Sequence, residues 1–254
     1  MGGVTNLCSA LERQEARRLA PVINQHLVET DSPETDSIDA AQKRCIGIFA
    51  RAAQLGHVKT RIAAQLGDEA ALAIYKQLLS GTLERAAHMD ATLYLWATDT
   101  HCDYLQSLAA QYDCQLRLQV DGDLGERMQT AMEWMLSRNE HAVLIGSDCP
   151  VLTAPRLEES FAALEHADVV LTPAEDGGFV LIAAASKTAW SDKAMFSGVR
   201  WSTDRALGDT LNCLHDAYAQ VTILDRLWDV DTAADVSRAI QAGLLQRSGK
   251  GIGE

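Results

Sequence analysis

Short apolar runs recur along the chain from residue 45 onward, and longer segments of helical periodicity separate most of them. The runs are typical of buried strands, because Val, Ile and Leu follow one another with few polar interruptions. They occupy residues 45–50, 92–97, 115–120, 142–147, 168–173, 179–184 and 220–225. The alternation predicts an α/β fold of three layers, in which helices cover both faces of a mostly parallel sheet.

Two segments show the helical period most clearly. The segment from Asp68 to Ala87 carries apolar side chains at helical spacing, namely Leu72, Tyr75, Leu79 and Leu83. A second helix is expected from Gly125 to Leu136, with Met128, Ala131, Met132, Met135 and Leu136 on one face.

The first 42 residues differ from the rest. An amphipathic stretch from Ser9 to about Glu29 precedes the acidic run ETDSPETDSID, residues 29–39. We expect an N-terminal extension over residues 1–42, made of an amphipathic helix and an acidic linker. Since the whole chain has 254 residues and is 47% hydrophobic, residues 43–254 are expected to form a single domain.

Composition excludes some partners. A formal net charge of −13 argues against nucleic acid, because proteins that bind it concentrate positive charge. No apolar run approaches the roughly 18–20 residues that cross a bilayer, and the N-terminus lacks a signal-peptide pattern, so a cytoplasmic protein is expected. Six scattered cysteines form no close pair and are interpreted as reduced thiols: Cys8, Cys45, Cys102, Cys114, Cys149 and Cys213.

In such sheets ligands bind outside the carboxyl ends of the strands, so the residues that follow each run are the first candidates for a site. After residues 45–50, one short loop carries Arg51, Gly56, Lys59 and Arg61. Guanidinium and ammonium groups suit phosphate oxygens, and Gly56 would let the backbone approach a ligand. The spacing matches neither GxxxxGK[ST] nor GxGxxG, and a solvated basic loop is the alternative interpretation.

The run at 142–147 is followed by Asp148, Cys149 and Pro150. A carboxylate at the end of a central strand is well placed to hold Mg²⁺ or Mn²⁺, which prefer oxygen ligands and leave positions open for phosphates. The alternative is a cap for the helix expected near Thr153, although Thr153 and Pro155 already suit that helix start.

Three carboxylates gather late in the chain, at Asp229, Asp231 and Asp235. One helix cap needs only one such side chain, and Thr232 or Asp231 would serve. Mutually repelling carboxylates are easier to explain around a cation.

The run at 168–173 ends in a turn that contains Asp176, Gly177 and Gly178. A hairpin turn and a ligand site are compatible here, because the glycines would expose backbone N–H groups and Asp176 would accept a hydroxyl proton. Arg127 is a weaker candidate for ligand binding, since the first interpretation of its segment is the start of a helix. The segment 201–203 likewise reads first as a helix cap and only second as a substrate contact.

Six segments in this order within residues 43–240 resemble the bacterial family of radical-SAM/selenodomain-associated transferases, also described as glycosyltransferases of arsenosugar biosynthesis. The segments are FARAAQLGHVKTRIA, QVDGDLGERM, GSDCPVLT, TPAEDGGFVLI, WST and DVDTAAD. Two departures are Arg51, where relatives often have Lys, and Ala52-Ala53-Gln54, which replaces a loop that usually contains proline.

That family is similar to the GT-A-type nucleotide-diphospho-sugar transferases and to 2-phospholactate guanylyltransferase, so the resemblance implies a GT-A-type fold. It also implies that Arg51, Lys59 and Arg61 bind the donor's phosphates. Asp148 and Asp231 would then be metal ligands, and the turn from Asp176 to Gly178 would face the acceptor.

We expect a glycosyltransferase that uses Mg²⁺ or Mn²⁺ to move a sugar from a nucleotide-diphospho-sugar to a small-molecule acceptor. Asp148 and Asp176 are the catalytic candidates; Asp176, Gly177, Gly178 and Arg127 are the acceptor-binding ones. A nucleotidyltransferase that couples a nucleoside triphosphate to a phosphorylated small molecule is the first alternative, and a non-catalytic nucleotide-binding protein is the second. Neither nucleic acid nor a membrane is expected as a partner, and a homodimer is left open.

Overall fold

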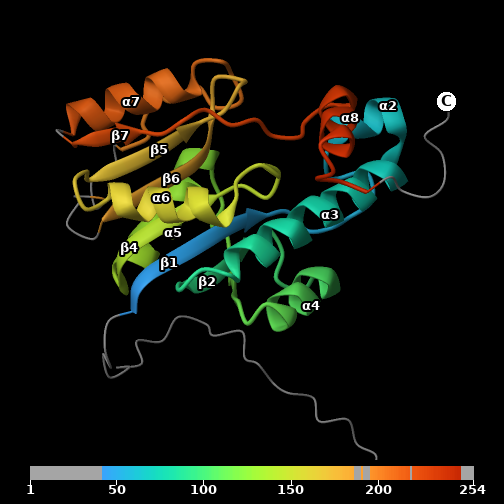
Figure 1. Ribbon diagram of the computed structural model, residues 1–254, viewed down its shortest axis with the longest axis horizontal. Helices are drawn as coiled ribbons and strands as arrows, with labels where there is room; N and C mark the ends of the chain where they lie inside the picture. The colour runs from blue at the N-terminus through green and yellow to red at the C-terminus, as the bar shows by residue number, and fades with distance from the viewer. Residues whose placement is uncertain (1–41, 186–189, 191–194, 218, 247–254) are drawn as a thin grey trace, which may run out of the picture. The chain divides into compact units, whose positions relative to one another are not determined.

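A seven-stranded mixed sheet forms the centre of the structure, a computed structural model that describes residues 42–185, 190, 195–217 and 219–246 (Figure 1). The expected N-terminal helix and acidic linker, and also Cys8, lie outside the described residues. The strands are β1 (Gln42–Ala50), β2 (Thr92–Ala97), β3 (Gln115–Leu118), β4 (Asn139–Ile145), β5 (Val169–Pro173), β6 (Phe179–Ala185) and β7 (Val221–Ile223).

The sheet has the strand order β3-β2-β1-β4-β6-β5-β7. Only β6 runs against its neighbours, because it pairs antiparallel with both β4 and β5, whereas the other pairs are parallel. The expected mostly parallel sheet is therefore confirmed. The antiparallel strand follows from the short turn at residues 174–178, since a connection this short joins antiparallel strands only.

The expected helices at 68–87 and 125–136 are confirmed as α3 and α5. The described helices are α2 (Thr60–Leu66), α3 (Asp68–Ala86), α4 (Asp103–Gln111), α5 (Leu124–Leu136), α6 (Ala154–Ala163), α7 (Ala206–Asp216) and α8 (Ala233–Gln241). Arg61 was expected on a loop, but it lies in the first turn of α2. This short helix is rich in helix-forming residues and ends at Gly67, whose φ of 85° the other residue types rarely adopt.

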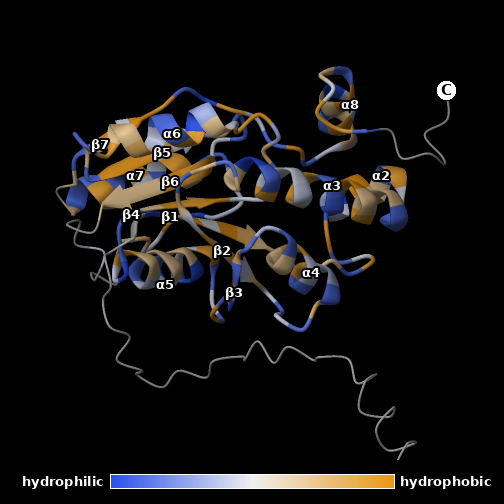
Figure 2. Cartoon of the chain, turned by 60° about the horizontal axis from the view of Figure 1, so that its bottom comes forward, coloured by the Kyte–Doolittle hydropathy of each residue, from blue (hydrophilic) through white to orange (hydrophobic). Residues whose placement is uncertain are grey.

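Buried side chains on the two faces of the sheet form two separate clusters, as expected for three layers. One cluster joins the sheet to α3, α4 and α6, and the other joins the opposite face to α5 and α7. Figure 2 shows the hydrophobic strands between these helices. A third cluster packs α2, α3 and α8 together around Ile62, Leu78 and Val230.

Strand alternation decides which side chains reach each cluster. On β1, Ile46 and Ile48 lie on the face covered by α3, whereas Cys45 and Gly47 lie on the α5 face. A Cβ at Gly47 would come within 2.9 Å of both Leu144 and Met135. The missing side chain therefore lets the last turn of α5, which carries Met135, pack close to the sheet.

Five cysteines lie within the described residues, and all five are free thiols. This agrees with the interpretation of the scattered pattern. No helix among the described residues is long and apolar enough to span a bilayer.

Candidate functional site

A cleft of about 630 Å³ lies at the carboxyl ends of the strands. Most of the residues singled out from the sequence line it: Arg51, Lys59, Arg61, Arg127, Asp148, Asp176, Gly178 and Asp231. Gly56 and Gly177 are not among the lining residues. Residues that were predicted because they follow strand ends therefore line one cleft, although their segments are far apart in the sequence.

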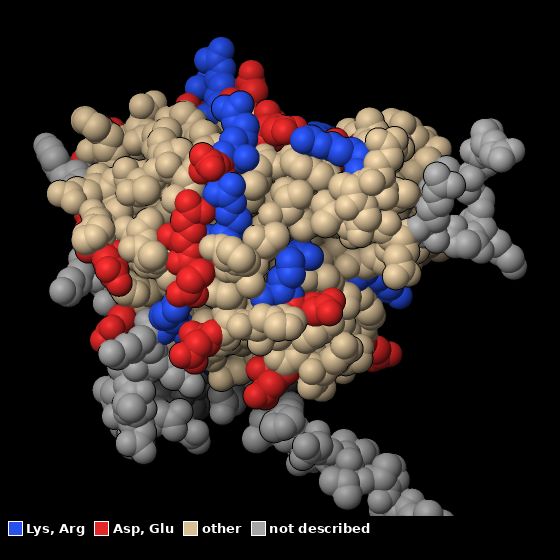
Figure 3. Space-filling model, in the orientation of Figure 1, with Lys and Arg blue, Asp and Glu red and all other residues tan. Residues whose placement is uncertain are grey.

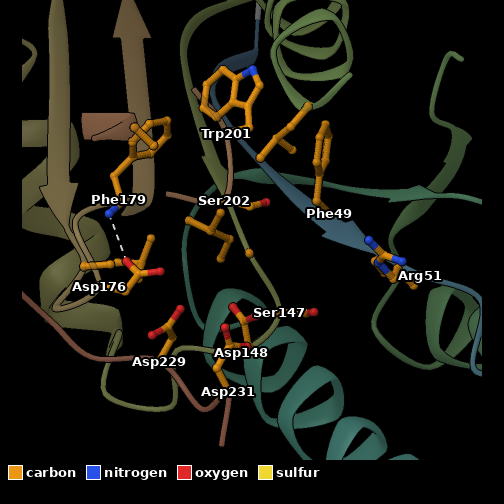
Figure 4. Close-up of a pocket in the computed structure, with 18 of the residues that line it drawn as sticks. Phe49, Arg51, Ser147, Asp148, Asp176, Phe179, Trp201, Ser202, Asp229 and Asp231 are labelled. Carbon is orange, nitrogen blue, oxygen red and sulfur yellow. Dashed lines mark hydrogen bonds between the residues drawn. The ribbon is translucent and has the colours of Figure 1, made fainter. Parts of the chain in front are cut away.

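Three carboxylates converge in this cleft (Figure 4). Oxygens of Asp148, Asp229 and Asp231 all lie within 4.8 Å of one another. Asp148 follows β4, whereas the other two lie on the segment before α8. The backbone N–H of Val230 donates to the carbonyl oxygen of Asp148 at 3.0 Å and joins the two segments.

A single ammonium group bridges two of these carboxylates. Lys59 Nζ lies 2.9 Å from Asp148 Oδ2 and 2.8 Å from Asp231 Oδ1, and only 10% of the lysine side chain is exposed. Burial alone would lower the pKa of Lys59, but the charges of the two aspartates outweigh it and raise that pKa above its ordinary value. The backbone of Lys59 has a φ of 47°, a left-handed conformation just before α2.

Asp229 is the carboxylate that Lys59 does not contact directly. Burial raises its pKa to about 7, and the negative charges of Asp148, Asp231 and Asp176 add to the effect. Asp231 behaves differently: burial would raise its pKa, but Lys59 and Arg61 lower it below the ordinary range. The cluster therefore holds more negative charge than one lysine balances.

This donor set fits a divalent cation. Carboxylate oxygens are the preferred ligands of Mg²⁺ and Mn²⁺, and a raised carboxyl pKa marks a charge that a bound cation would stabilise. Asp229 was recognised in the sequence as one of three carboxylates, but only Asp148 and Asp231 were expected as ligands. Asp235 does not join them, because its carboxylate closes a capping box with Thr232 at the start of α8.

The basic segment after β1 is held by hydrogen bonds to its backbone. The hydroxyl of Tyr75 accepts from the N–H of Arg51 at 2.9 Å and donates to the carbonyl oxygen of Arg51 at 2.7 Å. The next N–H, that of Ala52, donates to Thr98 Oγ1 at 3.0 Å. The Arg51 side chain is exposed and lies away from the acidic cluster (Figure 4).

The turn between β5 and β6 packs against the segment before α7. Gly177 has a φ of 90°, and a Cβ there would meet the backbone of Asp204 at 2.3 Å. The carbonyl oxygen of Gly177 accepts from the N–H of Leu207 at 2.9 Å. Gly177 is thus a contact between two loops, and its neighbours Asp176 and Gly178 face the cleft.

Arg127 lies one turn into α5, whose start is closed by a capping box between Asp123 and Glu126. Its Nε donates to the carbonyl oxygen of Gly122 at 3.0 Å, and the residue lines the cleft. The sequence interpretation of a helix start is confirmed here.

The segment 201–203 was read first as a helix cap, and this is wrong. The N-cap of α7 is Arg205 and the helix starts at Ala206. Trp201, Ser202 and Thr203 precede the helix and line the cleft, and the second interpretation, a substrate contact, stays a prediction.

Apolar residues form a part of the cleft wall that sequence reasoning missed. Phe49 on β1, Phe179 on β6, and Leu124 and Met128 on α5 all line the cleft with Trp201. A phenylalanine within an apolar strand has the sequence pattern of a core residue, so no local signal identified Phe49 or Phe179 as cleft residues.

On the face shown in Figure 3, basic and acidic side chains of the described residues lie side by side and form no continuous basic patch. This distribution agrees with the overall negative charge and offers no broad surface for a phosphate backbone on that face.

Comparisons with known proteins agree with the fold. Residues 82–203 match the model of the family described as "Uncharacterized protein conserved in bacteria" (DUF2064). The chain is 25% identical over 196 residues to 2-phospho-L-lactate guanylyltransferase of Methanothermobacter thermautotrophicus, covering 74% of this chain and 80% of that protein.

Two solved structures place the fold. A protein of Desulfovibrio desulfuricans G20, proposed to be a nucleotide-diphospho-sugar transferase, is 27% identical with a TM-score of 0.72, covering 81% of this chain and 89% of that one. The 4-diphosphocytidyl-2C-methyl-D-erythritol synthase of Anaerococcus prevotii is 12% identical with a TM-score of 0.54, covering 80% and 99%. The architecture is thus that of the nucleotide-diphospho-sugar transferases, and the chain resembles transferases that act on nucleotides.

Proposed function

We propose that this protein is a metal-dependent nucleotidyltransferase, which joins a nucleoside triphosphate to a small anionic acceptor. The observation that carries the proposal is the acidic cluster of Asp148, Asp229 and Asp231, bridged by Lys59, in a cleft that Arg51 and Arg61 also line. Anionic ligands of a divalent cation and cationic ligands of phosphate thus lie in one cleft.

In the proposed reaction, an oxygen of the acceptor forms a bond to the α-phosphorus of the triphosphate. The bond from that phosphorus to the oxygen that bridges the α- and β-phosphates breaks, and pyrophosphate leaves with the electron pair. A divalent cation held by the three aspartates would neutralise negative charge on the phosphates. Arg51 would bind the pyrophosphate from the exposed side of the cleft, and Arg61 would bind it from the first turn of α2.

The similarity to 2-phospho-L-lactate guanylyltransferase, which covers 80% of that protein, supports nucleotidyl transfer and moves it ahead of the sugar transfer that we expected first. Both reactions would take place in the same cleft and would use a divalent cation held there.

Glycosyl transfer is the second candidate, favoured by the 27% identity to the Desulfovibrio protein. In that reaction an acceptor oxygen would form a bond to the sugar carbon, the bond from that carbon to the diphosphate oxygen would break, and a nucleoside diphosphate would leave with the electron pair. An inverting reaction would need a base, and the exposed carboxylate of Asp176, at the edge of the cleft, would serve.

The test compares ligands with and without Mn²⁺ by thermal shift, followed by titration calorimetry of those that bind. GTP, CTP, UDP-glucose and GDP-mannose serve as the panel. We expect a triphosphate to stabilise the protein only with Mn²⁺, and Asp148→Asn to remove the effect. Asp225→Asn, which changes an exposed carboxylate outside the cleft, is the matched control.

Preference for a nucleotide sugar would favour glycosyl transfer over nucleotidyl transfer. Equal binding with and without Mn²⁺, unchanged in Asp148→Asn, would contradict the proposed role of the acidic cluster.

A further inference from the structure

The cleft has two chemically different parts. Figure 4 shows the three aspartates in one part, and Phe49, Phe179 and Trp201 in another. Leu124 and Met128 from α5 complete the apolar part. This apolar part lies on the α5 face of the sheet, whereas the basic segment and α3 belong to the opposite side.

We call Phe49, Phe179 and Trp201 the aromatic wall of the cleft. Ring contacts fix two of these three residues, Phe179 and Trp201. Phe179 and Trp201 meet edge to face with ring centroids 6.3 Å apart, and Trp201 also packs on Phe196 at 5.8 Å. Gly125 on α5 makes room for the indole, because a Cβ there would come within 3.0 Å of it. A rigid wall of this kind favours a flat apolar ligand, since little conformational freedom is lost on binding.

Two of the polar side chains that line the cleft near this part are already engaged, which leaves Ser202 and Asp204 for a ligand that carries many hydroxyls. Gln119 Nε2 donates to the carbonyl oxygens of Ala50 and Trp96. The Thr203 hydroxyl donates to the carbonyl oxygen of Arg200 at 2.7 Å and accepts from the N–H of Arg205 at 3.2 Å. A polyhydroxylated ligand would lose hydrogen bonds to water without equivalent replacements.

A positive charge stands at the edge of the apolar wall. Arg127 lies one turn after Leu124, and its Nε donates a hydrogen bond to the carbonyl oxygen of Gly122. Among the described residues no carboxylate forms an ion pair with Arg127, so its remaining N–H groups are available to an anion.

We propose that the acceptor is a small organic anion with a flat apolar body, such as an aromatic carboxylate or phosphate, and not a polyol. Its body lies against Trp201 and Phe179, and Arg127 binds its anionic group. That this anion is the acceptor rests on the proposed function. The preference of the apolar part of the cleft for a flat apolar anion can be measured without any nucleotide.

The experiment compares phenyl phosphate with glycerol 3-phosphate, which have similar charge and different bodies. Binding to the full chain is measured by titration calorimetry, first without nucleotide and then with Mn²⁺ and GTP. We expect phenyl phosphate to bind about tenfold more tightly in both conditions. Equal affinities, tighter binding of glycerol 3-phosphate, or no detectable binding of phenyl phosphate would overturn the proposal.

Variants locate the binding. Trp201→Leu and Arg127→Gln should each lower the affinity for phenyl phosphate about tenfold and leave the affinity for GTP with Mn²⁺ unchanged. Trp201→Phe should keep most of the affinity for phenyl phosphate. Since Trp201→Leu risks unfolding, Leu124→Glu provides a second test at an exposed position. The added charge should repel the anion, and Leu118→Glu, at an exposed leucine outside the cleft, should not.

Two outcomes separate the proposals. A variant at Trp201 that weakens GTP as much as phenyl phosphate would assign the aromatic wall to the nucleotide base and overturn the inference. Normal phenyl phosphate selectivity without any metal-dependent nucleotide binding would instead support the inference and contradict the proposed function.

Discussion

The ammonium of Lys59 lies 2.9 Å from the carboxylate of Asp148, in the place where a cation would neutralise the acidic cluster. The same ammonium contacts Asp231 at 2.8 Å. Lys59 is therefore an internal counter-ion for the residues that would bind metal. A divalent cation would compete with this lysine for the same oxygens, and this competition can be tested.

Lys59→Met should destabilise the protein in the absence of metal, because it leaves the carboxylates without a counter-ion. We expect the free energy of unfolding to fall by about 1–3 kcal/mol, less than for a fully buried pair because about a third of each aspartate is exposed to water. Mn²⁺ should restore stability and bind more tightly than to the natural protein. Urea denaturation at several Mn²⁺ concentrations measures both.

Lys76→Met, which removes an ammonium beside the ring of Tyr104, is the control for a general effect of charge. Weaker Mn²⁺ binding in Lys59→Met would show that the lysine supports the metal instead of competing with it.

Metal binding should strengthen as pH rises toward neutrality, because Asp229 must lose its proton to act as a ligand. Its pKa is about 7 in the folded protein and 3.8 ordinarily. Between these values the folded chain holds a proton that the unfolded chain has lost, so without metal the free energy of unfolding should fall as pH rises. Titration calorimetry with Mn²⁺ and urea denaturation across this window measure the two effects.

Asp229→Asn should remove most of the pH dependence of both quantities in that window. A variant that kept the full dependence would exclude Asp229 as the titrating group.

Tyr75→Phe should loosen the basic segment. The change leaves the N–H and the carbonyl oxygen of Arg51 without their partner, which should cost about 1–3 kcal/mol of stability. It should also weaken metal-dependent nucleotide binding, since Arg51 would be less well placed. Tyr104→Phe is the matched control, because that hydroxyl donates one hydrogen bond to the carbonyl oxygen of Lys76 outside the cleft. Equal nucleotide affinity in both variants would rule out a positioning role for Tyr75.

Gly177→Ala should separate the turn after β5 from the segment before α7. The φ of 90° is strained for alanine, and its Cβ would overlap the backbone of Asp204. We expect a loss of more than about 1 kcal/mol, together with weaker acceptor binding. Gly208→Ala, within α7 and with nothing within 4 Å of the added Cβ, should stabilise the protein by about 0.5–1 kcal/mol. Thermal denaturation of the two variants distinguishes a local clash from a general effect of alanine.

Much of the fold follows from the sequence because the strands are continuous apolar runs. The seven runs correspond to seven strands among the described residues, with ends that differ by a few positions. The edge strand β3 ends at Leu118 instead of residue 120, and exposure does not mark this end, since Leu118 within the strand is 58% exposed and Val120 beyond it is 40% exposed. Apolar character alone does not show where pairing with a neighbour stops.

The candidate site was partly predictable for a similar reason. Asp148 follows β4, and the basic segment, which carries Arg51, Lys59 and Arg61, follows β1. Their positions after strands made both predictable from the sequence. Asp229, Asp231 and Asp235 were indistinguishable by composition. Asp229 and Asp231 flank the buried Val230, and both carboxylates reach Asp148, whereas the carboxylate of Asp235 closes the capping box of α8. The aromatic wall required tertiary structure, because it brings together three residues from separate parts of the chain.

The hydrogen bond from the N–H of Val230 to the carbonyl oxygen of Asp148 involves main-chain atoms only. The anchor points of the aspartates on both segments are therefore set by the fold and do not depend on the side chains that they carry. Replacement of one aspartate by asparagine or glutamate would alter charge and reach while the spacing of the anchors persists. Single substitutions at these positions would therefore change which cation is preferred during evolution, while the backbone that carries the side chains stays the same.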